Sequence, residues 1–327
     1  MKVLFLQTAH SAHDERVYYH QEPVLRAAGY ACAIVSTIGL RGYRKFKTCS
    51  EALRRHRPDI VLCDTPYAVL IAKCHGARRV IYDVTEWCSK KILLSLAGRL
   101  CDAFIFGEEG KMAPYKRFIT KKPFTLLPYF PTEKYIPYLP VEDLGSAPLK
   151  LLYAGPATEE KGIGNVLAAV EAIARRLPLR TVELTIITDS SVMPPPKGLH
   201  VTWKKSMDYH SFCEELTKYH FFLDLRNTNA QTTQSLPIKL FYYMAAGRPM
   251  VYTNMEGIRH FLPEELPFIA LVDPTSPEAI SDYICHLAQT PHLYREACTV
   301  ARQYYLSHCR WDDSLSQRLL DVVQVPS

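Results

Sequence analysis

The sequence lacks a long apolar run, because no stretch approaches the roughly 18 residues that cross a bilayer. Its first residues, MKVLFLQTAH, place a charge in an apolar segment that is too short for a secretory signal. The 327 residues are 48% hydrophobic and 22% charged, a balance typical of globular proteins and not of disordered chains. We therefore expect a cytoplasmic protein with two domains.

Cysteines at the spacing of metal or redox sites are also missing. The ten cysteines never form a CxxC pair, and most of them lie among apolar residues, as small reduced core residues do. His10 and His13 form a His-x-x-His pair, but no cysteine or acidic residue at ligand spacing completes a zinc site around them. We therefore predict no bound metal.

Charge is distributed unevenly along the chain. Lysine and arginine exceed the acidic residues by eight in residues 1–145, whereas residues 146–327 have a net charge of −2. The excess predicts an anionic partner for the N-terminal half, such as a membrane surface or a phosphorylated substrate, with a solvated basic face as the alternative. No aromatic platform or known motif accompanies the charge, which disfavours nucleic acid.

Apolar runs alternate with helical patterns along the N-terminal half. KVLFLQT, ACAIVST, DIVLCDT, RRVIYDV and DAFIFG are short runs rich in strand-forming residues, and FTLLPYF follows them. Helical patterns separate them, with predicted helices at 48–57, 66–76, 89–100 and 109–119. Repeated βα units of this kind predict a parallel sheet covered by helices on both faces.

A second alternation begins after the proline-rich stretch YIPYLPVEDLGSAPLK, where we place a domain boundary between residues 147 and 148. The predicted strands here are LKLLYAG, VELTIIT, LHVTWKK, FFLDLR, PMVYTN and FIALVD. Helices are predicted at 162–176, 208–219, 236–246 and 255–263, and residues 276–323 are helical in pattern with a break near Pro291. Two doubly wound α/β domains are therefore predicted.

The loop after the first predicted strand, QTAHSAHDE, contains no glycine. Dinucleotide-binding proteins carry GxGxxG at this point, because the pyrophosphate needs close approach to bare backbone. The sequence therefore argues against NAD, FAD and P-loop ATP, and it implies no cofactor.

The second half offers two predicted anion sites. In YAGPATEEKGIG, the chain turns at Gly155 after a strand, and Lys161 and Gly162 stand at a helix start, which predicts an ammonium and free amide groups facing a phosphate. In SLPIKLFYYMAAGRPMV, a helix is predicted with Ser235 as its cap, Pro237 in its first turn and its end at Gly247. Two such helix starts suit a diphosphate.

Several of these segments resemble one enzyme family. YAGPATEEKGI resembles the YxGRxxxEKG segment of family 4 glycosyltransferases (glycosyl transferases group 1), and PIKLFYYMAAGRPMV resembles their P-x-KLFEYMAAGKPVI segment. LVDPTSPEAI and the late Trp311 resemble the segments that follow. In the N-terminal half, HDERVYYHQEPVLRAAGY resembles a D-x-R-V first helix, and VIYDVTEW resembles an IYDVHE motif.

The resemblance implies the GT-B fold, in which two Rossmann-like doubly wound parallel-sheet domains face a cleft. Residues 1–147 are then the acceptor-binding domain and residues 148–305 the nucleotide-sugar-binding domain. Residues 306–327 are expected to form a helix that crosses back to the first domain. The resemblance also implies a retaining, metal-independent transfer of sugar from a nucleoside diphosphate, UDP- or GDP-linked, to an acceptor hydroxyl.

Four positions depart from the family pattern. Pro156 stands where the family has arginine, and Thr85 stands where the IYDVHE motif has histidine. The E-x7-E pair of the family is degenerate, with Gln234 and Tyr242 in place of its two glutamates. Neutral hydrogen bonds there are weaker than charge-assisted ones. The departures favour the alternative of a GT-B pseudoenzyme that serves as a non-catalytic binding subunit.

Donor-binding residues are predicted in the second domain from the two anion sites and the resemblance. Arg226 follows the strand FFLDL and is a candidate to replace the cation that is absent at Pro156. Tyr242 stands at the family's ribose position. The full predicted donor set is Gly155, Lys161, Gly162, Arg226, Gln234, Ser235, Leu236, Pro237, Lys239 and Tyr242.

Catalytic and acceptor-binding residues are predicted mainly in the first domain. Asp64, Asp83 and Glu86 follow successive strands, where carboxylates orient or deprotonate an acceptor hydroxyl, although loop capping explains them equally well. Lys161 joins them as the catalytic cation. His10, His13 and Arg16 are predicted to bind the acceptor.

Two basic segments, 41–57 and 89–100, suit contact with an anionic membrane, and the second has apolar residues between its charges. Ordinary solvated helices are the alternative. The leading hypothesis is a glycosyltransferase that acts on a carbohydrate or lipid-linked acceptor in surface polysaccharide or glycolipid synthesis, at the inner face of the cytoplasmic membrane.

Overall fold

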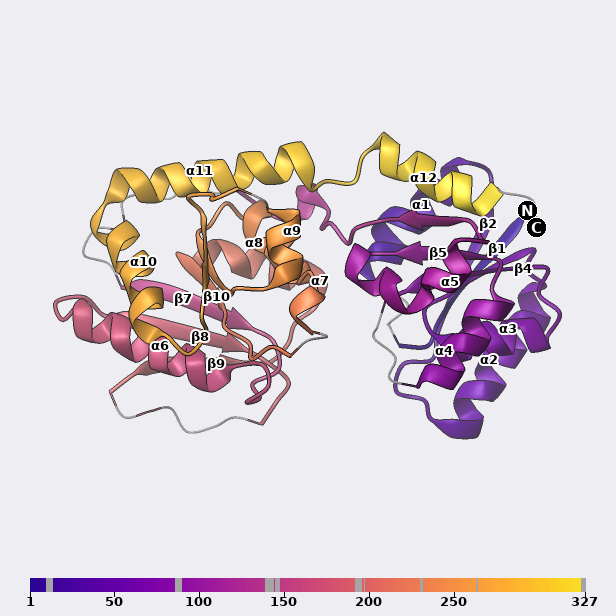
Figure 1. Ribbon diagram of the computed structural model, residues 1–327, viewed down its shortest axis with the longest axis horizontal. Helices are drawn as coiled ribbons and strands as arrows, with labels where there is room; N and C mark the ends of the chain where they lie inside the picture. Colours follow the sequence, from indigo (N-terminus) through magenta and orange to yellow (C-terminus); the bar gives the residue numbers. More distant parts are fainter. Residues whose placement is uncertain are drawn as a thin grey trace. The chain divides into compact units, whose positions relative to one another are not determined.

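The computed structural model describes residues 1–9, 14–85, 90–138, 144, 148–191, 196, 198–229, 232–262 and 264–324. The chain forms two compact units, one of residues 1–130 with 311–327 and the other of residues 131–310 (Figure 1). The division thus lies after Phe130, whereas the sequence placed it after residue 147, and the returning segment starts at Trp311. Across the described residues, none of the helices has the length and apolarity that crossing a membrane requires.

The first unit contains a six-stranded sheet in the order β2-β1-β3-β4-β5-β6, with every pair of neighbours parallel. Its strands are β1 (Lys2–Gln7), β2 (Ala31–Ser36), β3 (Ile60–Cys63), β4 (Arg79–Val84), β5 (Ala103–Phe106) and β6 (Phe124–Leu126). All residues of β3, β4 and β5 are buried, which agrees with their continuous apolar runs.

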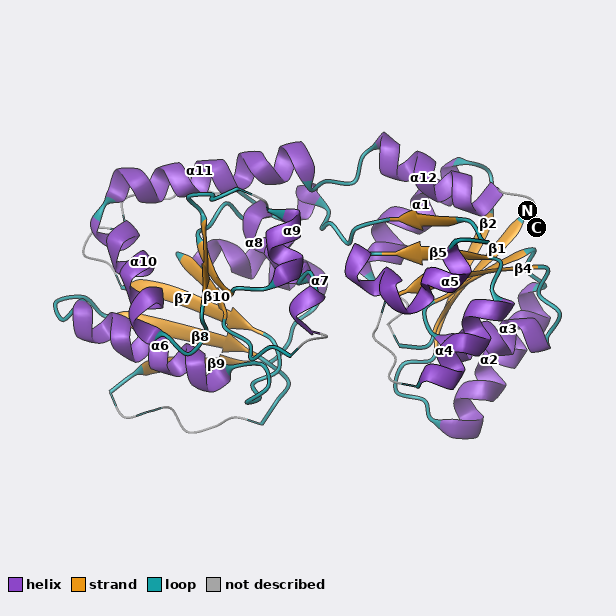
Figure 2. Cartoon of the chain, viewed as in Figure 1, coloured by secondary structure: helices purple, strands orange, loops and turns teal. Residues whose placement is uncertain are grey.

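Helices cover both faces of this sheet (Figure 2). They are η1 (Arg16–Gln21), α1 (Glu22–Ala27), α2 (Gly42–His56), α3 (Pro66–Cys74), α4 (Lys91–Leu100), η2 (Glu109–Tyr115), α5 (Lys116–Ile119) and α12 (Asp313–Gln324). The turn η1 is a π-helix, so the predicted first helix has two parts. Helix α12 packs on α1 and the β5–β6 edge, and Arg79 Nη2 donates to the carbonyl of Val322 at 2.7 Å.

The second unit repeats the plan with a parallel sheet in the order β12-β11-β10-β7-β8-β9. Its strands are β7 (Leu149–Ala154), β8 (Val182–Ile187), β9 (His200–Lys204), β10 (Phe221–Asp224), β11 (Met250–Thr253) and β12 (Ile269–Val272). Its helices are η3 (Glu133–Tyr135), α6 (Ile163–Arg176), α7 (Tyr209–Glu215), η4 (Leu216–Lys218), η5 (Thr232–Gln234), α8 (Ile238–Ala245), α9 (Glu256–Phe261), α10 (Pro277–Gln289) and α11 (Pro291–His308).

The strand order gives the second sheet a switch point. β7 lies between β8, which follows it in sequence, and β10, which comes later. The chain runs outward from β7 to β8 and β9 on one side, and it then crosses to β10 on the other side of β7. In doubly wound sheets the loops diverge at this point and leave a crevice beyond the carboxyl ends of the strands. The loops after β7, β8 and β10 are therefore where a ligand is expected.

Seven of the described cysteines are buried: Cys49, Cys63, Cys101, Cys213, Cys285, Cys298 and Cys309. All nine described cysteines have free thiols, as predicted, and Cys88 lies outside the described residues. The seven buried cysteines fill the cores of the two units as small apolar side chains, whereas Cys32 is half-buried and Cys74 is exposed.

Candidate functional site

A cavity of about 440 Å³ lies beyond the carboxyl ends of β7, β8 and β9 in the second unit. Most of its wall comes from the loops after these strands, and helices α7 and α8 complete it. The lining residues are Ala154, Gly155, Pro156, Ile187, Asp189, Ser190, Ser206, Met207, Phe212 and Lys239. The cavity thus lies beside the switch point, at the loops after β7 and β8 where a ligand is expected and at the loop after β9, whereas none of the described lining residues comes from the loop after β10.

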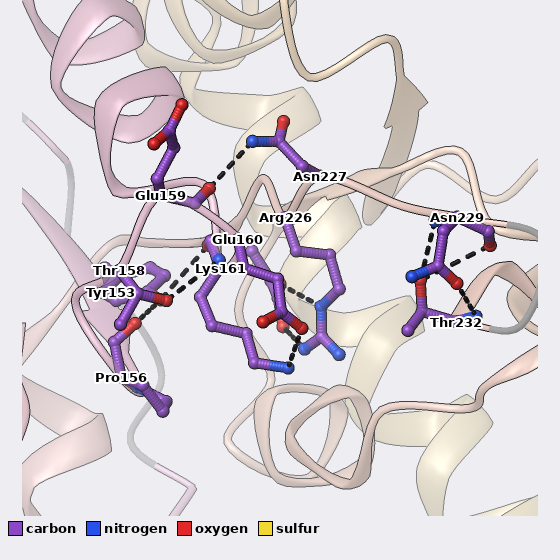
Figure 3. A network of polar contacts seen from close by, with 11 residues as sticks. Tyr153, Pro156, Thr158, Glu159, Glu160, Lys161, Arg226, Asn227, Asn229 and Thr232 are labelled. Carbon is purple, nitrogen blue, oxygen red and sulfur yellow. Dashed lines mark hydrogen bonds and ion pairs between the residues drawn. The ribbon is translucent and has the colours of Figure 1, made fainter. Parts of the chain in front are cut away.

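The loop between β7 and α6 is held in place by the buried side chain of Tyr153 (Figure 3). The Tyr153 hydroxyl lies 2.7 Å from the carbonyl oxygen of Pro156 and 3.3 Å from that of Lys161. Burial raises the pKa of this hydroxyl, which therefore stays protonated and able to donate. One side chain thus fixes both ends of the turn that carries the predicted phosphate contacts.

Glycine is required where this loop enters α6. Gly162 has a φ of +72°, and a Cβ atom there would lie 1.9 Å from the carbonyl oxygen of Leu225, after β10. The contact is tightened by Asn165, whose Nδ2 donates to the same oxygen at 2.9 Å. The sequence signal Lys161-Gly162 therefore marks a close approach of two backbone segments.

The backbone amides of this turn donate hydrogen bonds to acceptors within the turn itself. Those of Lys161, Gly162 and Ile163 donate to the Thr158 hydroxyl, the Glu159 carbonyl and the Thr158 carbonyl, respectively. The prediction that free amides at the Lys161-Gly162 turn face a ligand is wrong for these three groups. A polar turn with its own acceptors satisfies them first.

Arg226, the predicted replacement cation, is neutralised by its neighbour. Its guanidinium binds both carboxylate oxygens of Asp224, with Nε 2.7 Å from Oδ1. Burial lowers the pKa of Arg226, but the Asp224 carboxylate outweighs this effect and raises it. The pair therefore contributes little net charge to the cavity.

Lys161 lies on the outer side of the same network, with 36% of its side chain exposed. Its Nζ is 3.8 Å from the Glu160 carboxylate, and Figure 3 shows the charged ends of Lys161, Glu160 and Arg226 close together. Lys161 does not line the cavity. Its charge is therefore shared with Glu160 before any ligand arrives.

Lys239 is the cation that lines the cavity itself. It is half-buried in the first turn of α8, and no carboxylate among the described residues lies within ion-pair distance of its ammonium. Burial lowers its pKa; Asp224 opposes the shift, whereas Arg226 and Lys161 add to it. An uncompensated, partly desolvated ammonium is stabilised by an anion in the cavity.

Helix α8 begins later than the sequence suggested. Its first residue is Ile238 and its N-cap is Pro237, with no side-chain cap bond, so the prediction that Ser235 caps the helix is wrong. Ser235 instead lies in a turn, where its amide donates to the carbonyl of Thr232. Leu236, half-buried, connects that turn to Pro237. The amide of Leu240 donates to the Pro237 carbonyl, whereas the amides of Ile238 and Lys239, at the first two positions of α8, have no acceptor inside the helix.

Gln234 is fixed by a carboxylate from the next loop. Its side-chain amide donates to Glu256 at the start of α9, whose own amide lies 3.4 Å from the Thr233 hydroxyl. A Cβ atom on Gly257 would lie 2.5 Å from the carbonyl oxygen of Ser235, so α9 packs closely on this turn. Glu256 thus places a carboxylate next to the position where the family pattern has its first glutamate.

Tyr242 packs against aromatic side chains of α7. It is buried, and its ring centroid lies 5.6 Å from that of Phe212, which lines the cavity, and 6.1 Å from that of Tyr209. A tyrosine at this position therefore supports the cavity wall through packing. Its role in donor binding stays a prediction.

Residues 148–290 match the family model of glycosyl transferases group 1. This range contains every residue that lines the cavity. A comparison with curated protein sequences finds no match.

Solved structures match both units at low sequence identity. Sucrose-phosphate synthase from Thermosynechococcus elongatus matches with a TM-score of 0.74 and 12% identity, over 99% of this chain and 98% of that one. HepE from Anabaena, in complex with UDP and glucose, matches with a TM-score of 0.74 and 10% identity over the whole of both chains. An alpha-glucosyltransferase in complex with UDP and DNA matches with a TM-score of 0.70 and 14% identity over 99% of both chains.

The chain has a GT-B fold. The predicted fold class is thereby confirmed, with two parallel sheets and flanking helices in the GT-B order. The cavity lies in the C-terminal unit of this GT-B architecture.

In the N-terminal unit of the GT-B fold, Asp64 anchors a loop. Its buried carboxylate accepts from the amides of Thr8 and Ala9 at 2.7 to 2.8 Å and from the Thr8 hydroxyl at 3.0 Å. Because Asp64 follows β3 and Thr8 follows β1, the carboxylate ties together the ends of two neighbouring strands. This contact is structural, and a catalytic role for Asp64 stays a prediction.

Asp83 and Arg16 are paired inside the same unit. Both are buried, with Arg16 Nη1 3.4 Å from Asp83 Oδ1, and Gln21 donates to the other Asp83 oxygen at 3.0 Å. Burial lowers the pKa of Arg16, but Asp83 and then Asp14 outweigh it and raise the pKa. The pair fixes η1 against β4. The predicted residues His10, His13 and Glu86 lie outside the described residues.

The structure thus brings Gly155 and Lys239 to the cavity, and it places Lys161, Gly162 and Arg226 in the adjoining network. Sequence reasoning missed seven lining residues: Asp189, Ser190, Ser206, Met207, Phe212, Ala154 and Ile187. The first four follow β8 and β9, so the rule that ligands meet the loops after strands could have found them. Phe212, inside α7, carries no such signal.

Proposed function

We propose that the protein is a glycosyltransferase whose C-terminal unit binds a nucleoside diphosphate sugar in the cavity beyond β7, β8 and β9. The observation that carries the proposal is Lys239, an uncompensated ammonium in a cavity that lies wholly within the segment matching glycosyl transferases group 1. Similar folds have been solved with UDP and glucose and with UDP-glucose, which supports UDP as the first nucleotide to test.

The proposed reaction is transfer of the sugar to an acceptor hydroxyl. The bond between the anomeric carbon and the diphosphate oxygen breaks, and that oxygen takes the electron pair. The acceptor oxygen bonds to the anomeric carbon and loses its proton to a base. Lys239, the first amides of α8 and Lys161 stabilise the negative charge that develops on the diphosphate.

The remaining roles rest on the positions of residues after predicted strands and on the family resemblance. Asp83, Asp64 and Glu86 are proposed to act on the acceptor hydroxyl, with His10, His13 and Arg16 as acceptor contacts. Retention of configuration, independence of a metal, and an acceptor in polysaccharide or glycolipid synthesis are proposed on the same basis. The loops after β8 and β9, which line the cavity, are proposed to choose the sugar.

Donor turnover tests this function. The purified protein is incubated with UDP-glucose, UDP-N-acetylglucosamine and GDP-mannose, with and without candidate sugar acceptors, and release of UDP or GDP is followed by chromatography. We expect release from one donor, accelerated by an acceptor, and its loss in Lys239→Gln. Tight binding of a donor with no release under any condition would contradict sugar transfer and leave the protein a binding subunit.

A further inference from the structure

Helix α4 of the first unit presents an apolar stripe to solvent. Ile92, Leu96 and Leu100 are exposed over 79%, 41% and 41% of their surfaces, respectively. They are spaced four residues apart, so they lie along one side of the helix. A solvated helix carries polar residues on this side.

The stripe lies away from the side of α4 that packs on the core. The opposite side of α4 carries Leu94, which packs on the core of the first unit, with the buried residues Ala97 and Gly98 below it. The Phe118 ring of α5 packs so closely on Gly98 that a Cβ atom there would lie 2.5 Å from it. The core contacts of α4 thus lie on this side, and Ile92, Leu96 and Leu100 are not among the described residues that form or pack on the core cluster.

Cations surround the stripe. Lys90, Lys91 and Arg99 belong to or adjoin α4, and all three are exposed. Helix α5 adds exposed basic residues, and Arg117 is joined to α4 by a 2.8 Å bond from its Nη2 to the Ser95 hydroxyl. Lys122 donates to the carbonyls of Gly98 and Arg99 at the end of α4.

Acidic residues do not offset this charge. In the described residues between 90 and 124, the carboxylates are Asp102, Glu108 and Glu109, against seven lysines and arginines outside η2: Lys90, Lys91, Arg99, Lys116, Arg117, Lys121 and Lys122. Asp102 is paired with Lys73 at 2.7 Å, and Glu108 with Lys111 at 3.1 Å. The surface is therefore positive around an apolar line.

We propose that α4 docks on an anionic lipid surface, with Ile92, Leu96 and Leu100 entering the headgroup boundary and the flanking cations meeting lipid phosphates. Apolar side chains alone would also suit a protein partner, but the ring of cations matches a negatively charged membrane. Single exposed apolar residues elsewhere carry no such meaning: Leu179 of the second unit is fully exposed on its own. The docking is independent of the sugar transfer proposed above.

Vesicle sedimentation tests the proposal with the full chain. The probes are phosphatidylcholine vesicles with and without phosphatidylglycerol, at low and high salt. We expect binding only to the anionic vesicles, weakened by salt, and an affinity at least about tenfold lower in Ile92→Glu/Leu96→Glu. Leu179→Glu, a single exposed aliphatic-to-acid change in the other unit, is the control and should bind as the wild type does.

Three results would overturn the proposal: no binding of the wild type to anionic vesicles, equal binding by the α4 variant and the wild type, or equal loss in Leu179→Glu. A dimer in sedimentation equilibrium that the α4 variant abolishes would also overturn it, by assigning the stripe to a second copy. Thermal unfolding and UDP affinity are measured on every variant. Unchanged values show that the α4 variant is folded and that its vesicle result is separate from nucleotide binding.

Discussion

Replacing Gly162 by alanine is expected to destabilise the protein by about 3 kcal/mol and to abolish nucleotide binding. The added Cβ atom would lie 1.9 Å from the carbonyl oxygen of Leu225, and the φ of +72° disfavours any residue with a side chain. Relief requires α6 to move away from the end of β10, which strains the Asn165 contact with the same oxygen. Urea unfolding followed by circular dichroism measures the change in the free energy of unfolding.

Gly164, two residues along the same helix, provides the control. A Cβ atom there meets no heavy atom within 4 Å, and Gly164 has helical backbone geometry. Gly164→Ala is therefore expected to be neutral or to stabilise the protein by up to about 1 kcal/mol, because alanine is the better helix former. Equal stabilities for the two variants would show that the contact between Gly162 and Leu225 is not needed.

Lys239→Gln is expected to lower the affinity for UDP by about tenfold to a hundredfold, while the fold is retained. A hydrogen bond to a charged partner contributes about 1.5–3 kcal/mol, which corresponds to that range. Lys239 lines the cavity with no ion-pair partner among the described residues, whereas Lys161 shares its charge with Glu160 and Arg226 with Asp224. Isothermal titration calorimetry with UDP measures the effect.

Lys150→Gln controls for the loss of one positive charge from the same unit. Lys150 is exposed near the start of β7, at the end opposite the cavity, so its replacement should leave UDP affinity unchanged. A pH series gives a second check. Burial lowers the pKa of Lys239, so UDP affinity should fall as pH rises through that lowered pKa, before an exposed lysine would lose its proton. Equal losses in Lys239→Gln and Lys150→Gln would show a general charge effect.

The fold could be predicted from the sequence because its signals are local and repeated. Apolar strand runs alternate with helical patterns, and the completely buried β3, β4 and β5 produce continuous apolar segments. The break predicted near Pro291 separates α10 from α11, because proline at the start of α11 cannot continue the preceding helix. Helix η1 was missed as a separate element, since its π-helical turn has no distinct sequence pattern.

The site could be predicted only in part, because its contacts join residues far apart in sequence. Lys161 and Gly162 were found from a local pattern, but the oxygen that excludes a side chain at Gly162 belongs to Leu225. The acceptors that occupy the amides of this turn belong to Thr158 and Glu159, and spacing alone does not show which way they point.

The predicted roles of Ser235 and Asp64 also show how little of the site the residue type alone predicts. Ser235 has the chemistry of a helix cap. However, the proline at 237 disfavours helical geometry at Leu236, the residue before it, and α8 starts only after Pro237. Asp64 has the chemistry of a base, but its partners are the amides of Thr8 and Ala9 on the neighbouring strand's loop. The first case was decided by a local effect of proline, and the second by tertiary pairing.

The cavity of the C-terminal unit is expected to bind a nucleoside diphosphate through its phosphates. Calorimetric titration of the full-length protein with UDP, UMP and uridine tests it most directly, with GDP and ADP as alternatives for the base. We predict that affinity falls in the order UDP, UMP, uridine, because Lys239 and the first amides of α8 bind phosphate, and that Lys239→Gln reduces the difference between UDP and uridine. Equal affinities for UDP and uridine, or no binding of any nucleoside diphosphate, would contradict the account.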